Sequence, residues 1–420
     1  MTQRQHSDSA CCNYFQCTGV SARGDAVSTI DESIIRQRIS SELFSEFCDV
    51  LFASLRRRDQ RQHAQRYLRG LLTTEGRKTI RRMAAKSGPA VEQSLQQFIS
   101  HSPWDWAPVR RALASYLEQN GKFAAVVVEQ VLISKAGEHS VGVERRFHQK
   151  LGRMISSQEV LGIWLAAEHD AYPIDWQMVL SGNWLDDERR RRAGVPDDAT
   201  VANAGELGVQ AAINVLHGWG LRPRPVVMDA RSLNFETIMN EFSRHGIPFA
   251  VRVYGSTPIS PTDSRVPFLT GRRMQASQLI HALRDLGQPV SGGPPGHRPT
   301  LVQCTRVKMP GQADQRTADE PPLVLLGVTS GGSTEYWLTS ITHVTSLALF
   351  RLTRTVDCVR EQRMLVSNDT GLRDFEGRSY RGWHHHVTLV SAAHAFRKLL
   401  SETIGERPGL VTADMLRRRA

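Results

Sequence analysis

The stretch from Val126 to Gly142, VVVEQVLISKAGEHSVG, decides the fold. Its β-branched residues predict a buried strand, and one acid, Glu129, lies where that strand is expected to leave the core. A carboxylate at a strand end can hold a divalent metal ion. His139, later in the same stretch, is either a neighbour of this acid or a structural turn residue.

The apolar pattern on both sides of this stretch predicts a chain of several parts. Apolar residues recur at helical steps before it, and strands alternate with helices after it, as in an α/β core. The predicted parts are a flexible leader (1–38), an α-helical domain (39–120), the first part of an α/β core (121–254), a β-rich insertion (255–345), the C-terminal helices of the core (346–405) and a tail (406–420).

Within these parts the periodicity predicts individual elements. Strands are expected at Phe123–Ile133, Gly142–Phe147, Val160–Ala166, Pro225–Met228 and Phe249–Val253. Helices are expected at Gly205–Trp219, Phe235–His245 and Trp383–Leu400. In the insertion, strands are expected at Leu301–Val307, Leu323–Thr329 and Tyr336–Thr339.

Charge and composition bound the function. The 53 Lys and Arg residues exceed the 42 Asp and Glu residues, which gives a net charge of +11 and favours a polyanionic partner, nucleic acid first. The alternative is that an arginine-rich, high-GC genome raises the arginine content without any such partner. The chain contains no membrane-length apolar run, signal core, P-loop or GxSxG motif, so we expect a cytoplasmic protein without a membrane or small-molecule partner. Cys11, Cys12 and Cys17, near His6, form either a metal clip or free thiols.

Acids, bases and histidines are the candidate functional residues. Asp229 follows a second short strand, so it and Glu129 could share Mg²⁺ ions with a third acid, although strand-end acids often only begin loops. Three consecutive histidines, 384–386, point about 100° apart on a helix and cannot face one ion together. The basic residues form either a DNA-binding surface or a solvated helix face; they are Arg56, Arg57, Arg58, Arg61, Arg66, Arg69, Arg77 and Lys78.

Several motifs, in this order and spacing, carry a family resemblance. They are RRRDQRQHAQRYLRGLL, RKTIRRMA, LQQFISHSPWDWAPVRRAL, GEHSVGVERRF, PIDWQMVLSGNW with RRRRAGVP, and FEGRSYRGWHHHVTLVSAAHAF. Over about residues 44–400 the chain resembles bacterial insertion-sequence transposases with a DDE-type, ribonuclease-H-like nuclease core. The resemblance implies a helical DNA-binding domain, a core with a β-rich insertion, double-stranded DNA as partner, and three carboxylates that hold Mg²⁺ for strand cleavage and transfer.

The acidic motifs depart from the family pattern. Asp229 in VVMDA matches the second acid, but Arg231 follows where the family has a Gly-Tyr-Gly turn. Glu129 stands where the family has the first of two aspartates, and its extra methylene displaces the carboxylate. For the third acid, DCVREQRMLVSNDTGL offers Glu361 without the family's Trp and Lys, and Glu376 in FEGR is the alternative.

Three functions follow from these departures. The first is a DDE transposase-like DNA-binding protein with impaired catalysis, the second is a domesticated, non-enzymatic DNA-binding or regulatory protein, and the third is an active transposase that uses Glu129. A homodimer is expected only of a working transposase.

Overall fold

The computed structural model describes residues 40–135, 137, 139–148, 152–290, 299–310 and 322–405. The expected leader and tail, with the cysteines near His6, lie outside these ranges. The chain divides into two compact units at residues 45 and 46, and all elements below belong to the second unit. In the described part of the chain, no helix is long and apolar enough to cross a membrane.

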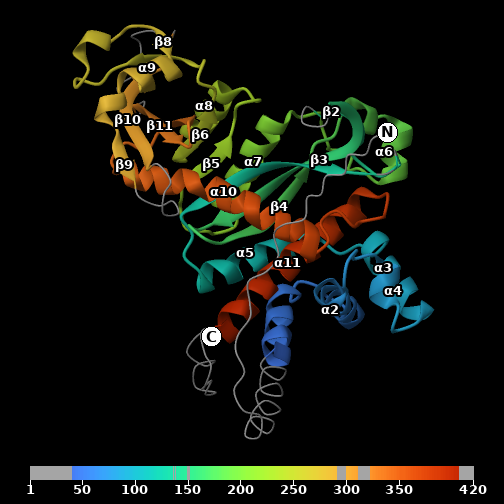
Figure 1. Ribbon diagram of the computed structural model, residues 1–420. Helices are drawn as coiled ribbons and strands as arrows, with labels where there is room; N and C mark the ends of the chain where they lie inside the picture. The colour runs from blue at the N-terminus through green and yellow to red at the C-terminus, as the bar shows by residue number, and fades with distance from the viewer. Residues whose placement is uncertain are drawn as a thin grey trace, which may run out of the picture. The chain divides into compact units, whose positions relative to one another are not determined.

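A single mixed sheet forms the centre of this unit (Figure 1). Its core strands are β1 (Ala125–Ser134), β2 (Val143–His148), β3 (Arg153–Ala166), β4 (Ala171–Met178), β5 (Val226–Asp229) and β6 (Phe249–Val253). The strand order is β2-β3-β1-β5-β6, and β4 also pairs with β3. Strand β1 runs antiparallel to β3 and parallel to β5, and β5 runs parallel to β6. Antiparallel strands joined to a parallel pair are the arrangement expected of a ribonuclease-H-like core.

The insertion extends this sheet. It contains α9 (Ala276–Ala282) and the strands β7 (Pro258–Pro261), β8 (Met274–Gln275), β9 (Gln288–Val290), β10 (Thr300–Lys308), β11 (Leu323–Ser330) and β12 (Ser333–Thr339). Strand β12 pairs antiparallel with β6, from Tyr336 opposite Val253 to Thr339 opposite Ala250. Main-chain hydrogen bonds therefore continue from the core into the insertion.

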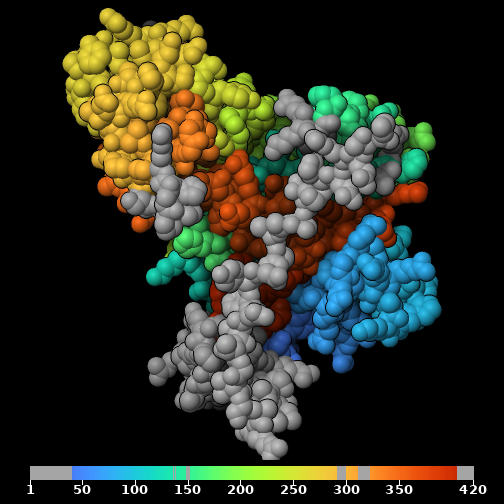
Figure 2. All heavy atoms as spheres, viewed as in Figure 1, coloured from blue at the N-terminus to red at the C-terminus, as the bar shows by residue number. Residues whose placement is uncertain are grey.

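Helices cover both faces of the core strands. On one face α7 (Ala204–Gly218) packs against β1 and β3, beside α8 (Phe235–Arg244). Asn203 caps α7 by accepting a hydrogen bond from the Glu206 amide. On the other face α10 (Ser346–Asp369) lies against β1 and β5, and α11 (Tyr380–Gly405) lies against β4. These two helices form one orange-to-red band across the face seen in Figure 2.

The N-terminal helical segment packs on α11. It comprises helical residues 46–51, α2 (Arg58–Thr73), α3 (Ile80–Ala84), α4 (Pro89–Ser100) and α5 (Trp106–Asn120). Helix α5 starts at Trp106, after Asp105, which caps the helix by accepting a hydrogen bond from the Ala107 amide. The segment lies in the same compact unit as the sheet.

The three histidines of α11 lie where this segment meets the core, and each has different partners. His384 and Arg110 of α5 contact each other, with 3.0 Å between Nδ1 and Nη2. The ring nitrogens of His385 lie near two carbonyl oxygens of the α4–α5 region, and its ring stacks on Trp104 at 3.8 Å. His386 lies 2.8 Å from the Tyr67 hydroxyl. The three rings thus secure the helical segment at three separate points.

Arg110 is the main polar link between the segment and the core. Its guanidinium, 2% exposed, donates to Asp175 of β4 at 2.6 Å and to the Trp176 carbonyl at 3.0 Å. It also donates to the Thr388 hydroxyl of α11 at 2.7 Å. Because the pair is buried and further hydrogen-bonded, it holds three elements in a defined geometry.

Candidate active site

A row of polar side chains crosses four neighbouring strands on the face covered by α10. Parallel pairing sets Val128 of β1 opposite Met228 of β5, so the next residues, Glu129 and Asp229, lie side by side. Asp229 lies opposite Arg252 of β6, which in turn lies opposite Trp337 of β12. Glu335, two residues before Trp337, accepts a hydrogen bond from Arg252 at 2.7 Å.

The two acids have different positions in their strands. Asp229 ends β5, as the sequence predicts. Glu129 had been expected at a strand end, but β1 continues to Ser134 and Glu129 lies in its middle, only 7% exposed. The strand continues because residues up to Ser134 pair with β3 along their full length.

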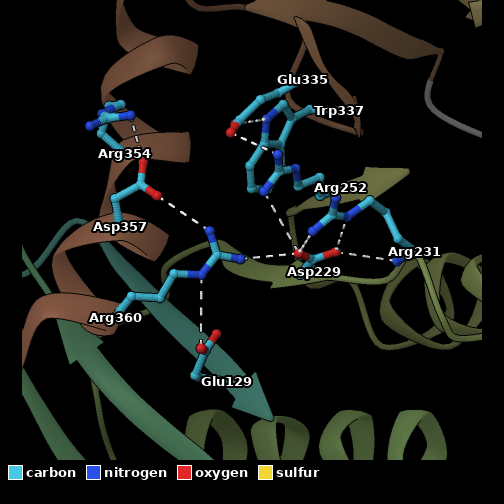
Figure 3. A network of polar contacts seen from close by, with 9 residues as sticks. All are labelled: Glu129, Asp229, Arg231, Arg252, Glu335, Trp337, Arg354, Asp357 and Arg360. Atoms are coloured by element: carbon cyan, nitrogen blue, oxygen red, sulfur yellow. Dashed lines mark hydrogen bonds and ion pairs between the residues drawn. The ribbon is translucent and has the colours of Figure 1, made fainter. Parts of the chain in front are cut away.

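Arginines surround Asp229 (Figure 3). The Arg231 side chain donates two hydrogen bonds to its carboxylate, from Nε at 2.9 Å and from Nη2 at 2.7 Å, and the Arg231 amide donates another at 3.3 Å. Arg360 of α10 donates a third side-chain hydrogen bond, from Nη2 at 3.0 Å, and Arg252 lies 3.8 Å away. The carboxylate is therefore already occupied by side-chain donors.

The Arg360 guanidinium lies between the two acids. Besides its bond to Asp229, its Nε is 3.9 Å from Glu129 Oε1, and its Nη1 donates to Asp357 at 3.3 Å. Arg363, one turn further along α10, has its Nε 3.7 Å from the same Glu129 oxygen. A positively charged group with only hydrogen-bond donors thus fills the space between the carboxylates.

These surroundings shift the two carboxyl pKa values in opposite directions. Burial raises the pKa of Glu129, and the attraction of Arg360 and Arg363 offsets this only in part, so the net shift is upward. Burial also raises the pKa of Asp229, but the hydrogen bonds and positive charge of Arg231, with the charge of Arg252, together outweigh it, so the net shift is downward. Asp229 therefore keeps its charge more readily than Glu129.

The structure does not bring either expected third acid to this pair. Glu361 is exposed on α10, and a helix turns about 100° per residue, so it points about 100° from Arg360 and about 200° from Arg363. Glu376 lies in the segment after α10 and pairs with Arg77 at 3.4 Å, 60% exposed. The α10 positions that face Glu129 therefore carry arginines.

The predicted DNA-binding residues fall into two groups. Arg58, Arg66 and Arg69 are exposed and lie within about 80° of one another on α2, and Arg56, Arg57 and Arg77 are exposed nearby. Two others are less exposed and bind main-chain oxygens: Arg61 donates to the Leu55 carbonyl at 2.7 Å, and Lys78 is buried, with its ammonium on the Thr74 carbonyl. Within the exposed group, Arg57 and Arg77 also form surface ion pairs. The charge pattern of the sequence does not separate the two groups.

The fold and this pair of acids on parallel neighbouring strands define a ribonuclease-H-like nuclease core. Residues 50–315 match the family model of the DDE superfamily endonucleases, so the chain belongs to that family. No curated protein matches the chain. Endonucleases of this transposase-type family act on DNA and generally use a divalent metal ion, typically Mg²⁺.

The residues present do not fit such an ion. Mg²⁺ binds oxygen ligands in near-ideal octahedral geometry, whereas a guanidinium offers no acceptor and repels a cation. The Arg360 guanidinium takes up the space between Glu129 and Asp229, and the α10 carboxylate beside it, Asp357, is itself paired with Arg360 and Arg354. Among the described residues, no group of three His, Cys, Asp or Glu side chains is arranged to hold a metal ion.

Proposed function

We propose that this protein is a transposase-like DNA-binding protein in which magnesium-dependent strand cleavage and transfer is impaired. One observation carries the proposal: the α10 side chains that face Glu129 are Arg360 and Arg363, where a metal-dependent nuclease needs a third acid. Without that acid, two carboxylates bound to guanidiniums are poor ligands for metal ions that would activate water or a 3′-hydroxyl.

The DNA-binding half of the proposal rests on the exposed arginines of α2. Arginine neutralises phosphates and releases counterions, so affinity falls steeply with salt. The duplex is the expected partner because the family acts on DNA. We infer that the protein acts in the cytoplasm, as either a degenerate transposase or a domesticated regulator.

The cleavage test uses purified full-length protein and duplex DNA that includes the sequences flanking its gene. With Mg²⁺ or Mn²⁺ we expect weak nicking or none, and Glu129→Asp alone does not restore it because the arginines remain. Strong metal-dependent nicking that Asp229→Ala abolishes would contradict impaired catalysis and favour the active transposase instead. A dimer on paired DNA ends, measured by light scattering, would point the same way.

The binding test compares two triple variants. Replacing Arg58, Arg66 and Arg69 by Gln removes three charges from one face of α2, and we expect the slope of log K against log salt to fall by about 3. The matched control, Gln at the exposed Arg244, Arg272 and Arg306, removes equal charge elsewhere and changes the slope much less. Binding insensitive to salt, or equal loss in both variants, would contradict the proposed surface.

A further inference from the structure

The centre between β1, β5 and α10 is an ordered ion-pair network. Four acids, Glu129, Asp229, Glu335 and Asp357, contact five arginines: Arg231, Arg252, Arg354, Arg360 and Arg363. The network stays connected without any added cation, as Figure 3 shows for nine residues in the region. Arginine side chains therefore neutralise the two core acids, Glu129 and Asp229.

Arg360 is the arginine of this network that contacts both core acids. Arg231, two residues after Asp229, and Arg252 of the neighbouring strand β6 contact Asp229, and Arg363 approaches only Glu129. Arg360 alone among the arginines in this network contacts Asp229, at 3.0 Å, and Glu129, at 3.9 Å. Its side chain is 32% exposed, so it closes the centre toward solvent.

The two acids need a cation between them. They lie side by side on parallel strands, and the negative charge of Asp229 makes ionisation of Glu129 harder. With an uncharged side chain at position 360, Asp229 would keep Arg231 and Arg252, and Glu129 would keep Arg363. No guanidinium would then lie between the two carboxylates. Two neighbouring, partly buried carboxylates with room between them attract a divalent cation.

We propose that Arg360 is the resident counter-cation of this centre, in the place between Glu129 and Asp229 that a divalent ion would take, and that a neutral residue at 360 converts the pair into a divalent-metal site. The inference goes beyond the proposed function, because it concerns cation binding rather than cleavage or DNA affinity. It also separates binding from catalysis: Arg231, Arg252 and Arg363 would remain beside the two acids, so the converted site would hold an ion without regaining full nuclease activity.

The experiment measures Mn²⁺ binding by the full-length protein, without DNA. Free Mn²⁺ is followed by electron paramagnetic resonance, and the melting temperature is recorded with and without excess Mn²⁺. We expect the wild type to bind no Mn²⁺ at this centre. Arg360→Gln should bind about one Mn²⁺ and gain on the order of 3 °C or more at a hundredfold excess over Kd.

Three variants assign the effect to the centre. Arg360→Lys keeps a cation and should stay insensitive to Mn²⁺. Arg351→Gln removes an exposed arginine from the same helix, near Glu168, and should behave as the wild type. Adding Asp229→Asn to Arg360→Gln should abolish the gained binding, because it removes one of the two ligands.

Two results would overturn the inference. One is a wild-type protein that already binds Mn²⁺ in a manner lost in Asp229→Asn, since Arg360 would then not exclude the ion. The other is a folded Arg360→Gln protein that binds none. If Arg360→Gln does not fold, Mn²⁺ binding by the wild type still tests whether Arg360 excludes the ion. Neither result depends on cleavage or DNA binding, so failure here is distinguishable from failure of the proposed function.

Discussion

Replacing Arg110 by Met is expected to loosen the attachment of the helical segment to the nuclease core. The change removes a guanidinium that donates to Asp175, Thr388 and the Trp176 carbonyl, and leaves the Asp175 charge buried at 8% exposure. Breaking a buried pair on one side costs about 3–5 kcal/mol. Gln177 still donates to the other Asp175 oxygen at 2.7 Å, so we expect the lower end, about 3 kcal/mol.

Urea unfolding followed by circular dichroism measures this loss. About 3 kcal/mol is roughly a hundredfold change in the folding equilibrium, and it should lower the midpoint with little change in slope. Arg110→Lys keeps the charge but not the planar fork, so we expect an intermediate loss.

A paired substitution tests whether Arg110 and Asp175 stabilise each other. Replacing Arg110 by Met and Asp175 by Leu together leaves no unpaired charge, so the double variant should be more stable than Arg110→Met alone. If the double loss equals the sum of the single losses, or if Arg110→Met stays within about 1 kcal/mol of the wild type, the buried pair does not couple these elements.

Three further outcomes follow from the structure. Burial lowers the pKa of His385 and of His386 to about 4, so both residues bind protons more readily in the unfolded chain. The free energy of unfolding should therefore fall as pH drops from about 6.5 to 4, by up to about 3 kcal/mol for each histidine. In thermal melts recorded against pH, His386→Gln should flatten this dependence, whereas the control His101→Gln, at an exposed position, should leave it unchanged. Glu129 behaves in the opposite sense: its raised pKa means that its contribution is present at low pH and is lost as pH rises through the folded value, so Glu129→Gln should remove that loss in the same melts. Finally, a Cβ on Gly208 would lie 3.0 Å from a Val128 methyl carbon, so Gly208→Val should cost about 1–3 kcal/mol in urea unfolding, whereas Gly218→Ala, with open space around it, should be near neutral.

Local pattern was sufficient to predict most strands and the helices between them. Phe249–Val253 was predicted with the observed bounds, and the acid that ends β5 was recognised as Asp229. Strand β4 was missed because Pro173 argues against a strand. The register shifts between Ile163 and Trp164 of the partner strand, and this irregularity accommodates the proline.

The chemistry of the centre could be predicted only in part. Arg231 and Asp229 are only two residues apart in the sequence, so their contact could have been predicted. Glu361 was predicted, but Arg360 and Arg363 are the α10 residues that face the pair. One position along a helix is about 100° of rotation, and the local sequence does not determine which side of α10 faces the sheet. Contacts such as Arg110 with Asp175, 65 residues apart, arise only from packing.

The pairing of β6 with β12 has a mechanical consequence. Because these strands share a ladder from Ala250 to Val253, the insertion cannot swing as a hinged flap without breaking main-chain hydrogen bonds inside the sheet. Strand β6 also carries Arg252, whose guanidinium holds Glu335 of β12. A displacement of the insertion is therefore transmitted through the paired strands to Arg252, the neighbour of Asp229. The amide hydrogens along that ladder should be among the slowest in the protein to exchange with water.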